Sequence, residues 1–392
     1  MSQGSRPAKR RAWLRVFAWL ALATCALLTL GLVDAWAALG TKPQGARQAR
    51  IESSPQFRGG TFVDTIPRVE PDLLAVSMRW FKGVEHSQPT APLPIIMRRA
   101  GEFAAAPSAL RITWFGHSTL LVEIEGRRVL LDPVWSERCS PSRFVGPKRF
   151  HPVPLEQGAL PRVDAVLISH DHFDHLDYRS VLELAKQNPL FVVPLGVGAH
   201  LEYWGVKPEQ IRELDWWQET SLGALRLVAT PARHFSGRGL GADRTLWSGW
   251  AMIGEERRVY YSGDTAMFEG FAQIGERLGP FDATLIEAGA YDAMWADVHL
   301  GPEQAVAAHQ AARGRVLFPV HWVTFDLALH SWVEPMERVL AAARLANVTV
   351  VTPKPGQSID PLAPPEPERW WPRTPWKTAS EAPVVSSGLP PH

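Results

Sequence analysis

The stretch that decides the fold is Ser169-His170-Asp171-His172-Phe173-Asp174-His175, in which three histidines and two aspartates fall within six consecutive positions. The residues just before it, 163–168, form a mostly apolar run with the length and branching of a buried strand. The cluster therefore lies on a loop where a strand ends, which is where α/β folds place their chemistry. Imidazole and carboxylate groups suit zinc and similar divalent ions. The H-x-H-x-D-H spacing predicts one ion beside His170 and His172 and a second ion beside Asp174 and His175.

A solvated polar loop that contains a helix cap is the alternative interpretation of this stretch. That interpretation suits a lone histidine, but it does not account for so many ligand-type side chains in so short a segment. We therefore expect a metal site.

The composition excludes several classes of protein. The chain has 392 residues, is 46% hydrophobic and carries a formal net charge of +1, so neither a disordered chain nor a nucleic-acid partner is expected. The two cysteines, Cys25 and Cys139, form no Cys-x-x-Cys pair, which excludes a structural zinc finger. Tryptophan is abundant, with 17 residues against 5 tyrosines, and it suits a membrane interface or an amphipathic groove as well as ordinary packing.

Residues 1–40 are predicted to be a basic segment followed by a membrane anchor. The first residues are polar and basic, and no charged residue occurs from Val16 to Val33, which is about the minimum length for a spanning helix. A cleaved secretory signal peptide is the alternative, with a cleavage site such as Ala35-Trp36-Ala37. We favour the anchor, because the apolar run is long for a signal peptide and Asp34 follows it.

The rest of the chain divides into three parts. Residues 41–108 are predicted to be a linker and lead-in that contains one short helix, from Pro71 to Gly83, and packs on the main domain. Residues 109–360 are predicted to be the main domain, where strands dominate each half and helices follow, so we expect an α+β arrangement of two packed sheets with helices outside. Residues 361–392 form a proline-rich tail that we expect to be loosely ordered.

Three later positions repeat the pattern of the opening loop, in which an apolar strand ends near a ligand-type residue. The predicted strand 225–229 leads to His234, strand 259–261 leads to Asp264, and strand 316–319 leads to His321. Each position alone could be a hydrogen-bonded histidine or an aspartate in an Asx turn. If these strand ends converge at one edge of a sheet sandwich, they complete the ligands of a two-metal site.

Further short motifs accompany these ligands in the main domain. They are Trp114-Phe115-Gly116-His117-Ser118-Thr119, Leu131-Asp132-Pro133-Val134-Trp135-Ser136, Gly146-Pro147-Lys148-Arg149-Phe150, Asp215-Trp216-Trp217, His234-Phe235-Ser236-Gly237-Arg238-Gly239, Ser262-Gly263-Asp264-Thr265 and His321-Trp322-Val323-Thr324-Phe325. With the opening stretch, they resemble the metallo-β-lactamase superfamily, and within it the N-acylphosphatidylethanolamine-hydrolysing phospholipase D family and its bacterial relatives. The resemblance covers roughly residues 111–353 and implies a four-layer αβ/βα sandwich, the metallo-β-lactamase fold.

The resemblance implies two bound zinc ions, although ligands of this kind also accept iron or manganese. One ion would be held by His170, His172 and His234, the other by Asp174, His175 and His321, and Asp264 would bridge both. A hydroxide shared by the ions would attack the phosphorus of a phosphodiester. Asp174 and Asp264 would then take part in catalysis by holding the metals.

The resemblance also marks His299 as a residue near the reacting group. His299 could clamp a phosphoryl oxygen or protonate the leaving alkoxide, or it could be only a helix cap. Lys148, Arg149 and Arg238 are candidate phosphate contacts, with ordinary surface charge as the alternative. For His117 we expect a structural role.

The expected function is that of a zinc-dependent phosphodiesterase that hydrolyses a phospholipid of the N-acylphosphatidylethanolamine type. The alternatives are hydrolysis of a lactone, a β-lactam or a soluble phosphodiester on the same site, a redox di-iron enzyme, and a non-catalytic membrane scaffold. His172 stands where di-iron enzymes of this fold have Glu, which favours hydrolysis. We expect a bacterial inner-membrane protein with a periplasmic catalytic domain, although Lys42 and Arg47 after the span leave its orientation open. The oligomeric state is left open.

Overall fold

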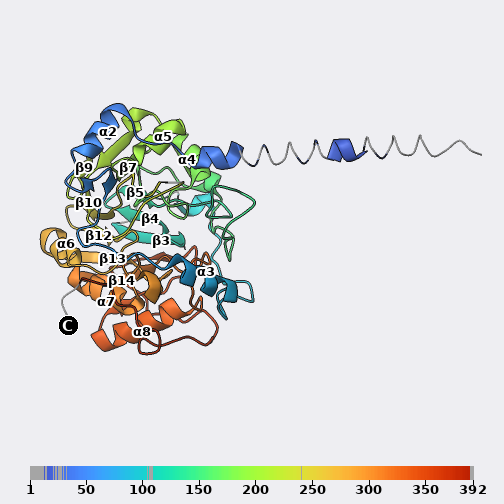
Figure 1. The fold of residues 1–392 in the computed structure, drawn as a ribbon. Helices are drawn as coiled ribbons and strands as arrows, with labels where there is room; N and C mark the ends of the chain where they lie inside the picture. The colour runs from blue at the N-terminus through green and yellow to red at the C-terminus, as the bar shows by residue number, and fades with distance from the viewer. Residues whose placement is uncertain are drawn as a thin grey trace, which may run out of the picture.

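A computed structural model of the chain describes residues 33–103, 105, 109–239 and 241–388, together with scattered positions before residue 33. In Figure 1 these residues form two sheets with helices on the outside. The predicted span Val16–Val33 lies partly outside the described residues. Within the described part of the chain, no helix is long and apolar enough to cross a bilayer.

Two seven-stranded sheets form the centre of the molecule. The first has the order β16 (Ser358–Ile359), β3 (Leu110–Gly116), β4 (Thr119–Ile124), β5 (Arg127–Leu131), β6 (Ala165–Leu167), β7 (Leu190–Pro194) and β8 (Ile211–Leu214). The second has the order β15 (Thr349–Val350), β14 (Gly314–Val320), β13 (Phe281–Glu287), β12 (Arg258–Tyr261), β11 (Gly249–Ile253), β10 (Leu225–Thr230) and β9 (Glu219–Leu222). Each sheet changes from antiparallel to parallel pairing, the first at β5 and the second at β12.

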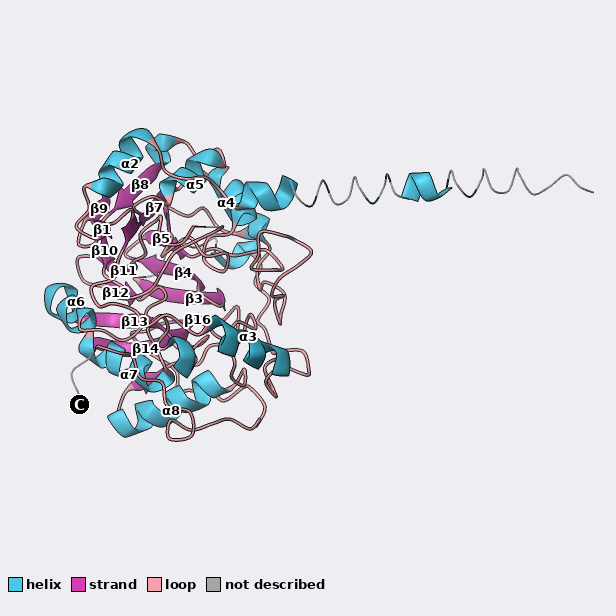
Figure 2. Ribbon diagram, viewed as in Figure 1, coloured by secondary structure: helices cyan, strands magenta, loops and turns pink. Residues whose placement is uncertain are grey.

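Helices cover the outer face of each sheet (Figure 2). The described helices are α2 (Gly45–Glu52), α3 (Leu73–Lys82), α4 (Tyr178–Ala185), α5 (Gly198–Tyr203), α6 (Gly270–Leu278), α7 (Pro302–Ala311) and α8 (Glu334–Ala346), with short 3-10 turns at Ala100–Phe103, Gln157–Ala159, Pro208–Gln210 and Ala293–Trp295. Apolar residues of α4 and α5 pack on the first sheet, and those of α6, α7 and α8 pack on the second. The helices and sheets thus form the four layers that the family resemblance implied.

The central strands of the first sheet, β4 to β7, are buried on both faces, and their side chains alternate between two cores. In β5, Val129 and Leu131 point into the core between the sheets, whereas Leu130 points into the core under α4 and α5. Because successive side chains of a strand point to opposite faces, such a strand must be apolar throughout. This explains why these strands appear in the sequence as continuous apolar runs.

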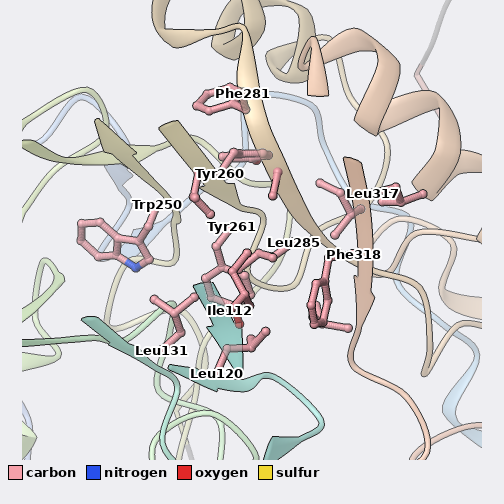
Figure 3. Close-up of a cluster of buried hydrophobic side chains, with 14 of the residues drawn as sticks. Ile112, Leu120, Leu131, Trp250, Tyr260, Tyr261, Phe281, Leu285, Leu317 and Phe318 are labelled. Carbon is pink, nitrogen blue, oxygen red and sulfur yellow. The ribbon is translucent and has the colours of Figure 1, made fainter. Parts of the chain in front are cut away.

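The core between the sheets is drawn in Figure 3, where Ile112, Leu120 and Leu131 of the first sheet face Trp250 and Tyr261 of the second. All of these side chains are fully buried, and burying one large apolar side chain contributes about 1.5–3 kcal/mol. Trp250 also ties the sheets together, because its Nε1 donates a hydrogen bond of 3.0 Å to the carbonyl of Ile168.

The predicted strands 225–229, 259–261 and 316–319 are the observed β10, β12 and β14, which extend one or two residues beyond the predicted ends. The weakest predictions are at the sheet edges, where β8 and β9 carry no clear apolar pattern. β9 alternates exposed and half-buried residues, as edge strands often do, and this removes the periodic signal that buried strands provide.

The lead-in packs on the main domain as predicted. Arg47 of α2 forms an ion pair of 2.8 Å with Glu213, and Ile51 is fully buried. A short hairpin, β1 (Phe57–Arg58) and β2 (Thr61–Phe62), follows, and its Phe62 is buried beside Ile51. The predicted helix Pro71 to Gly83 is α3, whose N-cap residue Asp72 accepts a hydrogen bond of 2.9 Å from the amide of Leu74.

The tail is bound to the domain over its described residues, 361–388, so the expectation of a loose tail is wrong. Trp371 is buried and donates a hydrogen bond of 2.8 Å to Glu337 of α8. Ser386 donates one of 2.7 Å to the carbonyl of Ala296, and Ser387 donates one of 2.6 Å to Asp297. A proline-rich segment loses little backbone entropy on ordering, so a few anchors of this kind hold it in place.

Candidate metal centre

Strand ends from both sheets bring the seven predicted ligand residues to one edge of the sandwich. The loop after β6 supplies His170, His172, Asp174 and His175, while His234, Asp264 and His321 follow β10, β12 and β14. All seven are buried except His172 and Asp174, which are half-buried. The predicted ligands thus meet in one place although they span more than a third of the chain.

Three imidazoles form the first half of the centre, which we call the imidazole triad: His170, His172 and His234. The Nε2 atom of His170 lies 2.8 Å from Nδ1 of His172, and Nε2 of His234 lies 3.4 Å from the same atom. Three ring nitrogens therefore face a common point, which is the donor set expected for a zinc ion.

Asp174, His175 and His321 form the second half, which we call the carboxylate triad. Oδ2 of Asp174 lies 3.4 Å from Nε2 of His175 and 3.3 Å from Nε2 of His321. This set has the same number of donors as the imidazole triad but carries an additional negative charge.

Asp264 lies between the two triads. Its Oδ2 is 3.1 Å from Nε2 of His175 and 3.0 Å from Nε2 of His321, and it is 3.8 Å from His234 and 3.9 Å from His170. The preceding residue, Gly263, has a φ of 61°, and a Cβ atom there would lie 2.8 Å from Ser169. A glycine before Asp264 therefore lets the turn approach the opening loop closely.

The ligand atoms fit divalent metal ions because several of them have no other partner. Nε2 of His175, both ring nitrogens of His321 and Oδ1 of Asp264 are buried, and none of them makes a hydrogen bond to the described part of the chain. Leaving a buried polar atom unpaired costs about 1–3 kcal/mol, so atoms of this kind indicate a missing partner. Cations at the centre would satisfy the two of these atoms that face it most closely, Nε2 of His175 and Nε2 of His321.

The charges of the two triads perturb each other strongly. Burial by itself would raise the pKa of Asp264, but the charges of His175 and His321 outweigh burial and hold it well below its usual value. Burial would lower the pKa of His321, but the negative charges of Asp264 and Asp174 raise it to about 10. In the imidazole triad, burial and the neighbouring His175 place the pKa of His170 well below its usual value.

Contacts outside the ligand set fix the ring orientation of three histidines. Nδ1 of His234 donates a hydrogen bond of 2.7 Å to the carbonyl of Val298, which leaves Nε2 as the free donor atom. Nδ1 of His175 donates one of 2.7 Å to Asp132. Nδ1 of His170 lies 2.9 Å from Ser169 Oγ, whose own proton goes to Asp132. Such partners fix the tautomer of metal-binding histidines.

His299 lies beside the two triads and is held by Glu287. Nδ1 of His299 donates a hydrogen bond of 2.8 Å to Oε2 of Glu287, which is fully buried and whose pKa is raised by burial. Glu287 also accepts hydrogen bonds from the amides of Thr265 and Leu300. The His299 side chain is 14% exposed and its Nδ1 lies 4.0 Å from Oδ2 of Asp264, so His299 borders the centre.

His117 contacts the centre through Asp174, so it is more than a packing residue. Its Nε2 lies 2.9 Å from Oδ2 of Asp174. Burial and the charge of His321 lower the pKa of His117 to about 3, so the ring is neutral and Nε2 donates its proton to the carboxylate. Its φ of 51° is unusual for a residue other than glycine, as is often found at functional sites.

Sequence reasoning missed Asp132, Glu287 and Asp171 as partners of the ligand set. Asp132 follows β5, and Glu287 is the last residue of β13, so both occupy the same strand-end positions as the ligands. Asp171 lies inside the opening stretch and accepts a hydrogen bond of 2.7 Å from the amide of Gly237, near His234. The strand-end position was the signal that could have identified the first two.

The predicted phosphate contacts are corrected for Arg149 and Arg238, whose guanidinium groups bind protein carbonyls. Arg149 donates to the carbonyls of Val134 and Ser136. Arg238 donates to those of Ala38, Asp171 and Leu176, and its guanidinium lies 4.2 Å from the ring centre of Phe173.

Burial lowers the pKa of both arginines to about 10, so both remain charged at neutral pH. They hold the loops around the centre instead of facing a ligand. Lys148 is exposed and forms an ion pair of 2.7 Å with Glu137.

Comparisons with known proteins identify relatives of this chain. A family model described as a beta-lactamase superfamily domain matches residues 127–322. An uncharacterised protein of Mycobacterium tuberculosis is 49% identical over 344 residues, which cover 86% of this chain and 92% of that protein. N-acyl-phosphatidylethanolamine-hydrolyzing phospholipase D 1 of Caenorhabditis elegans is 37% identical over 261 residues, which cover 63% of this chain and 73% of the relative.

Among solved structures, the isothiocyanate hydrolase from Delia radicum gut bacteria is similar to this chain. It is 19% identical, with a TM-score of 0.52, over 64% of this chain and 98% of that chain. At this level of identity the likeness shows a shared fold alone.

Proposed function

Because the chain belongs to the metallo-β-lactamase superfamily and is a metal-dependent hydrolase, we propose that it is a zinc-dependent phosphodiesterase of the phospholipase D type. Its substrate would be a phospholipid of the N-acylphosphatidylethanolamine type, and its products phosphatidate and an N-acylethanolamine. The observation that best supports metal-dependent hydrolysis is the pair of triads on either side of Asp264. The similarity to the Caenorhabditis elegans relative named above supports the substrate class.

The residues that would hold two ions follow from the distances above. The imidazole triad would bind one, the carboxylate triad the other, and Asp264 would contact both. Such ions lower the pKa of water toward neutrality and stabilise negative charge on phosphoryl oxygens. The buried outer partners, Asp132, Ser169 and the Val298 carbonyl, keep each donor nitrogen aimed at its ion.

His299 would act on the substrate itself. In hydrolysis, an oxygen from water bonds to phosphorus, the bond from phosphorus to the N-acylethanolamine oxygen breaks, and that oxygen gains a proton. Glu287 keeps a proton of His299 on Nδ1, which leaves Nε2 free to act on the substrate. Through Nε2, His299 would position a phosphoryl oxygen or relay the proton to the leaving oxygen.

The experiment that tests this function combines elemental analysis with turnover of an N-acylated phosphatidylethanolamine. We expect about two zinc ions per chain and lipid hydrolysis, and we expect His172→Ala to lose metal and activity together. The control is His86→Asn, which replaces an exposed histidine whose φ of 60° asparagine tolerates. Two ions with hydrolysis of a lactone or a soluble diester, but no lipid, would refute the substrate, and absence of metal would refute the site.

For the location, we propose a bacterial inner-membrane protein anchored through Val16–Val33, with the catalytic domain in the periplasm. The support is the uncharged apolar run after a basic start. Alkaline phosphatase fused after the last residue would be active if the domain is periplasmic. An active cytoplasmic reporter at the same position would reverse the orientation, and release of the protein into the soluble periplasm would indicate a cleaved signal peptide.

A further inference from the structure

α3 presents its apolar side to solvent. Leu73, Leu74, Met78 and Phe81 share one face of the helix, and they are 73%, 69%, 54% and 94% exposed. The opposite side, with Ala75 and Val76, is the one that is half-buried against the protein. None of the ten residues of α3 is buried. A helix of a globular protein normally shows the reverse pattern, with its apolar face on the core.

The helix is nevertheless fixed in position. Asp72 caps its N-terminus, and Arg79 forms an ion pair of 3.1 Å with Asp292. Just before α3, the amide of Val69 donates a hydrogen bond of 2.9 Å to Asp297. The apolar face is thus held outward by contacts on the other side, and contiguous exposed apolar surface of this kind marks an interaction site.

The charge near α3 and the position of this helix in the molecule indicate what kind of partner its apolar face would contact. Lys82 is exposed at the C-terminal end of α3, and a basic group beside an outward apolar face suits the boundary between headgroups and acyl chains of an anionic bilayer. A second exposed apolar pair, Phe144 and Val145, lies beside Arg143, which forms an ion pair of 3.0 Å with Asp34 of the N-terminal segment. In Figure 1, α3 lies on the same side of the body as the helical residues 33–38, which precede α2 in the chain.

We propose that α3, assisted by Phe144 and Val145, is an interfacial helix that docks the catalytic domain on an anionic lipid bilayer. The loop that holds α3, around Asp292 and Asp297, leads directly to Val298 and His299 at the metal centre. Docking through α3 therefore places the centre next to lipid headgroups. The inference rests on the proposed membrane location, but it does not depend on which phosphodiester is cleaved.

The test uses the full chain reconstituted in vesicles that contain phosphatidylglycerol. A fluorophore is attached at position 81 through Phe81→Cys in a Cys25→Ala background, since Cys139 is buried. The matched control is Leu345→Cys in α8, which is 91% exposed on another part of the surface. We expect brominated acyl chains to quench the label at position 81 and to leave the label at position 345 unquenched.

Turnover provides a second measurement. Leu74→Glu combined with Phe81→Glu should lower hydrolysis of a vesicle-embedded phospholipid by about tenfold or more, with hydrolysis of a short-chain, water-soluble diester unchanged. Leu345→Glu should affect neither substrate. Equal quenching at positions 81 and 345 would overturn the proposal. The label at position 81 could instead be shielded from solvent in the absence of lipid, in a chain that light scattering shows to be a dimer. That result would assign the apolar face of α3 to a second copy of the chain and would also overturn the proposal.

If neither substrate is hydrolysed but position 81 is quenched, the docking surface stands and the proposed function fails. The two proposals can therefore fail separately.

Discussion

The two halves of the metal centre offer equal numbers of ligands but differ in charge. In the imidazole triad, burial and the nearby His175 lower the pKa of His170, so this half presents neutral donors at neutral pH. In the carboxylate triad, Asp264 and Asp174 overcome the effect of burial and raise the pKa of His321 to about 10. That half is an ion-pair network before metal enters, and it must release protons to bind a cation. The types of ligand thus predict where ions bind, whereas the charge of each half decides how ion binding depends on pH.

The largest expected effect comes from removing the residue that joins the two halves. Asp264→Ala takes away the carboxylate that lies within 3.1 Å of His175 and His321 and within 3.9 Å of His170 and His234. We expect loss of both ions and a fall in kcat/KM of more than about 100-fold, because the loss of an outer partner alone costs about 10–100-fold. Elemental analysis and turnover measure both effects.

Asp360→Ala is the control for this substitution, since Asp360 is exposed and, among the described residues, its side chain accepts one hydrogen bond, from the nearby amide of Leu362. An Asp264→Ala protein that retains two ions would show that the halves bind metal independently.

Substitutions of the outer partners should have a smaller effect, which distinguishes the two halves of the centre. Asp132→Asn weakens the partner of His175, and we expect the carboxylate half to lose about 10–100-fold in zinc affinity. Ser169→Ala removes a hydroxyl that lies 2.9 Å from Nδ1 of His170 and 3.3 Å from Nδ1 of His175 and that donates to Asp132, so we expect about tenfold or less, spread over both halves. Competition with a chelator resolves the two binding steps. The comparison fails if Asp132→Asn weakens both steps equally.

The smallest effect is the pH dependence of zinc binding. A pKa of about 10 means that His321 is protonated at neutral pH in the metal-free protein, so each proton displaced makes zinc affinity rise about tenfold per pH unit. The pKa of His170 lies below its usual value, so the imidazole half should show no such rise above pH 7. Calorimetry in buffers of different ionisation enthalpy measures the protons released. Equal proton release at both steps would contradict the assignment.

The ligand residues could be predicted because each follows a buried strand. Val163–Ile168 is an apolar run, and residues 225–229 and 316–319 lead to His234 and His321 in the same way. A strand buried on both faces is apolar at every position, so its end is visible in the sequence as a sharp change to polar residues. The four-layer architecture could be predicted from the same pattern of apolar strands and from the resemblance to the metallo-β-lactamase superfamily.

The arginines show where this reasoning fails. Arg149 and Arg238 stand beside family motifs and were predicted to face phosphate, yet they bind carbonyls of the chain itself. Composition assigns arginine to the surface, but a guanidinium with several carbonyl partners is stable when buried. The prediction of a loose tail was wrong for the same reason, because composition does not show which residues are buried. The proline and serine content of the tail did not predict that Trp371 and Ser386 are buried.

The sequence by itself determined the types of ligand, their order along the chain and the strands that carry them, because local patterns of burial and chemistry encode all three. Only the tertiary structure decided which carboxylate supports which histidine, as Asp132 does for His175 and Glu287 for His299. Only the tertiary structure, too, turned the apolar face of α3 outward. These are contacts between segments far apart in sequence, and their formation depends on how two sheets and their loops pack, which no local pattern records.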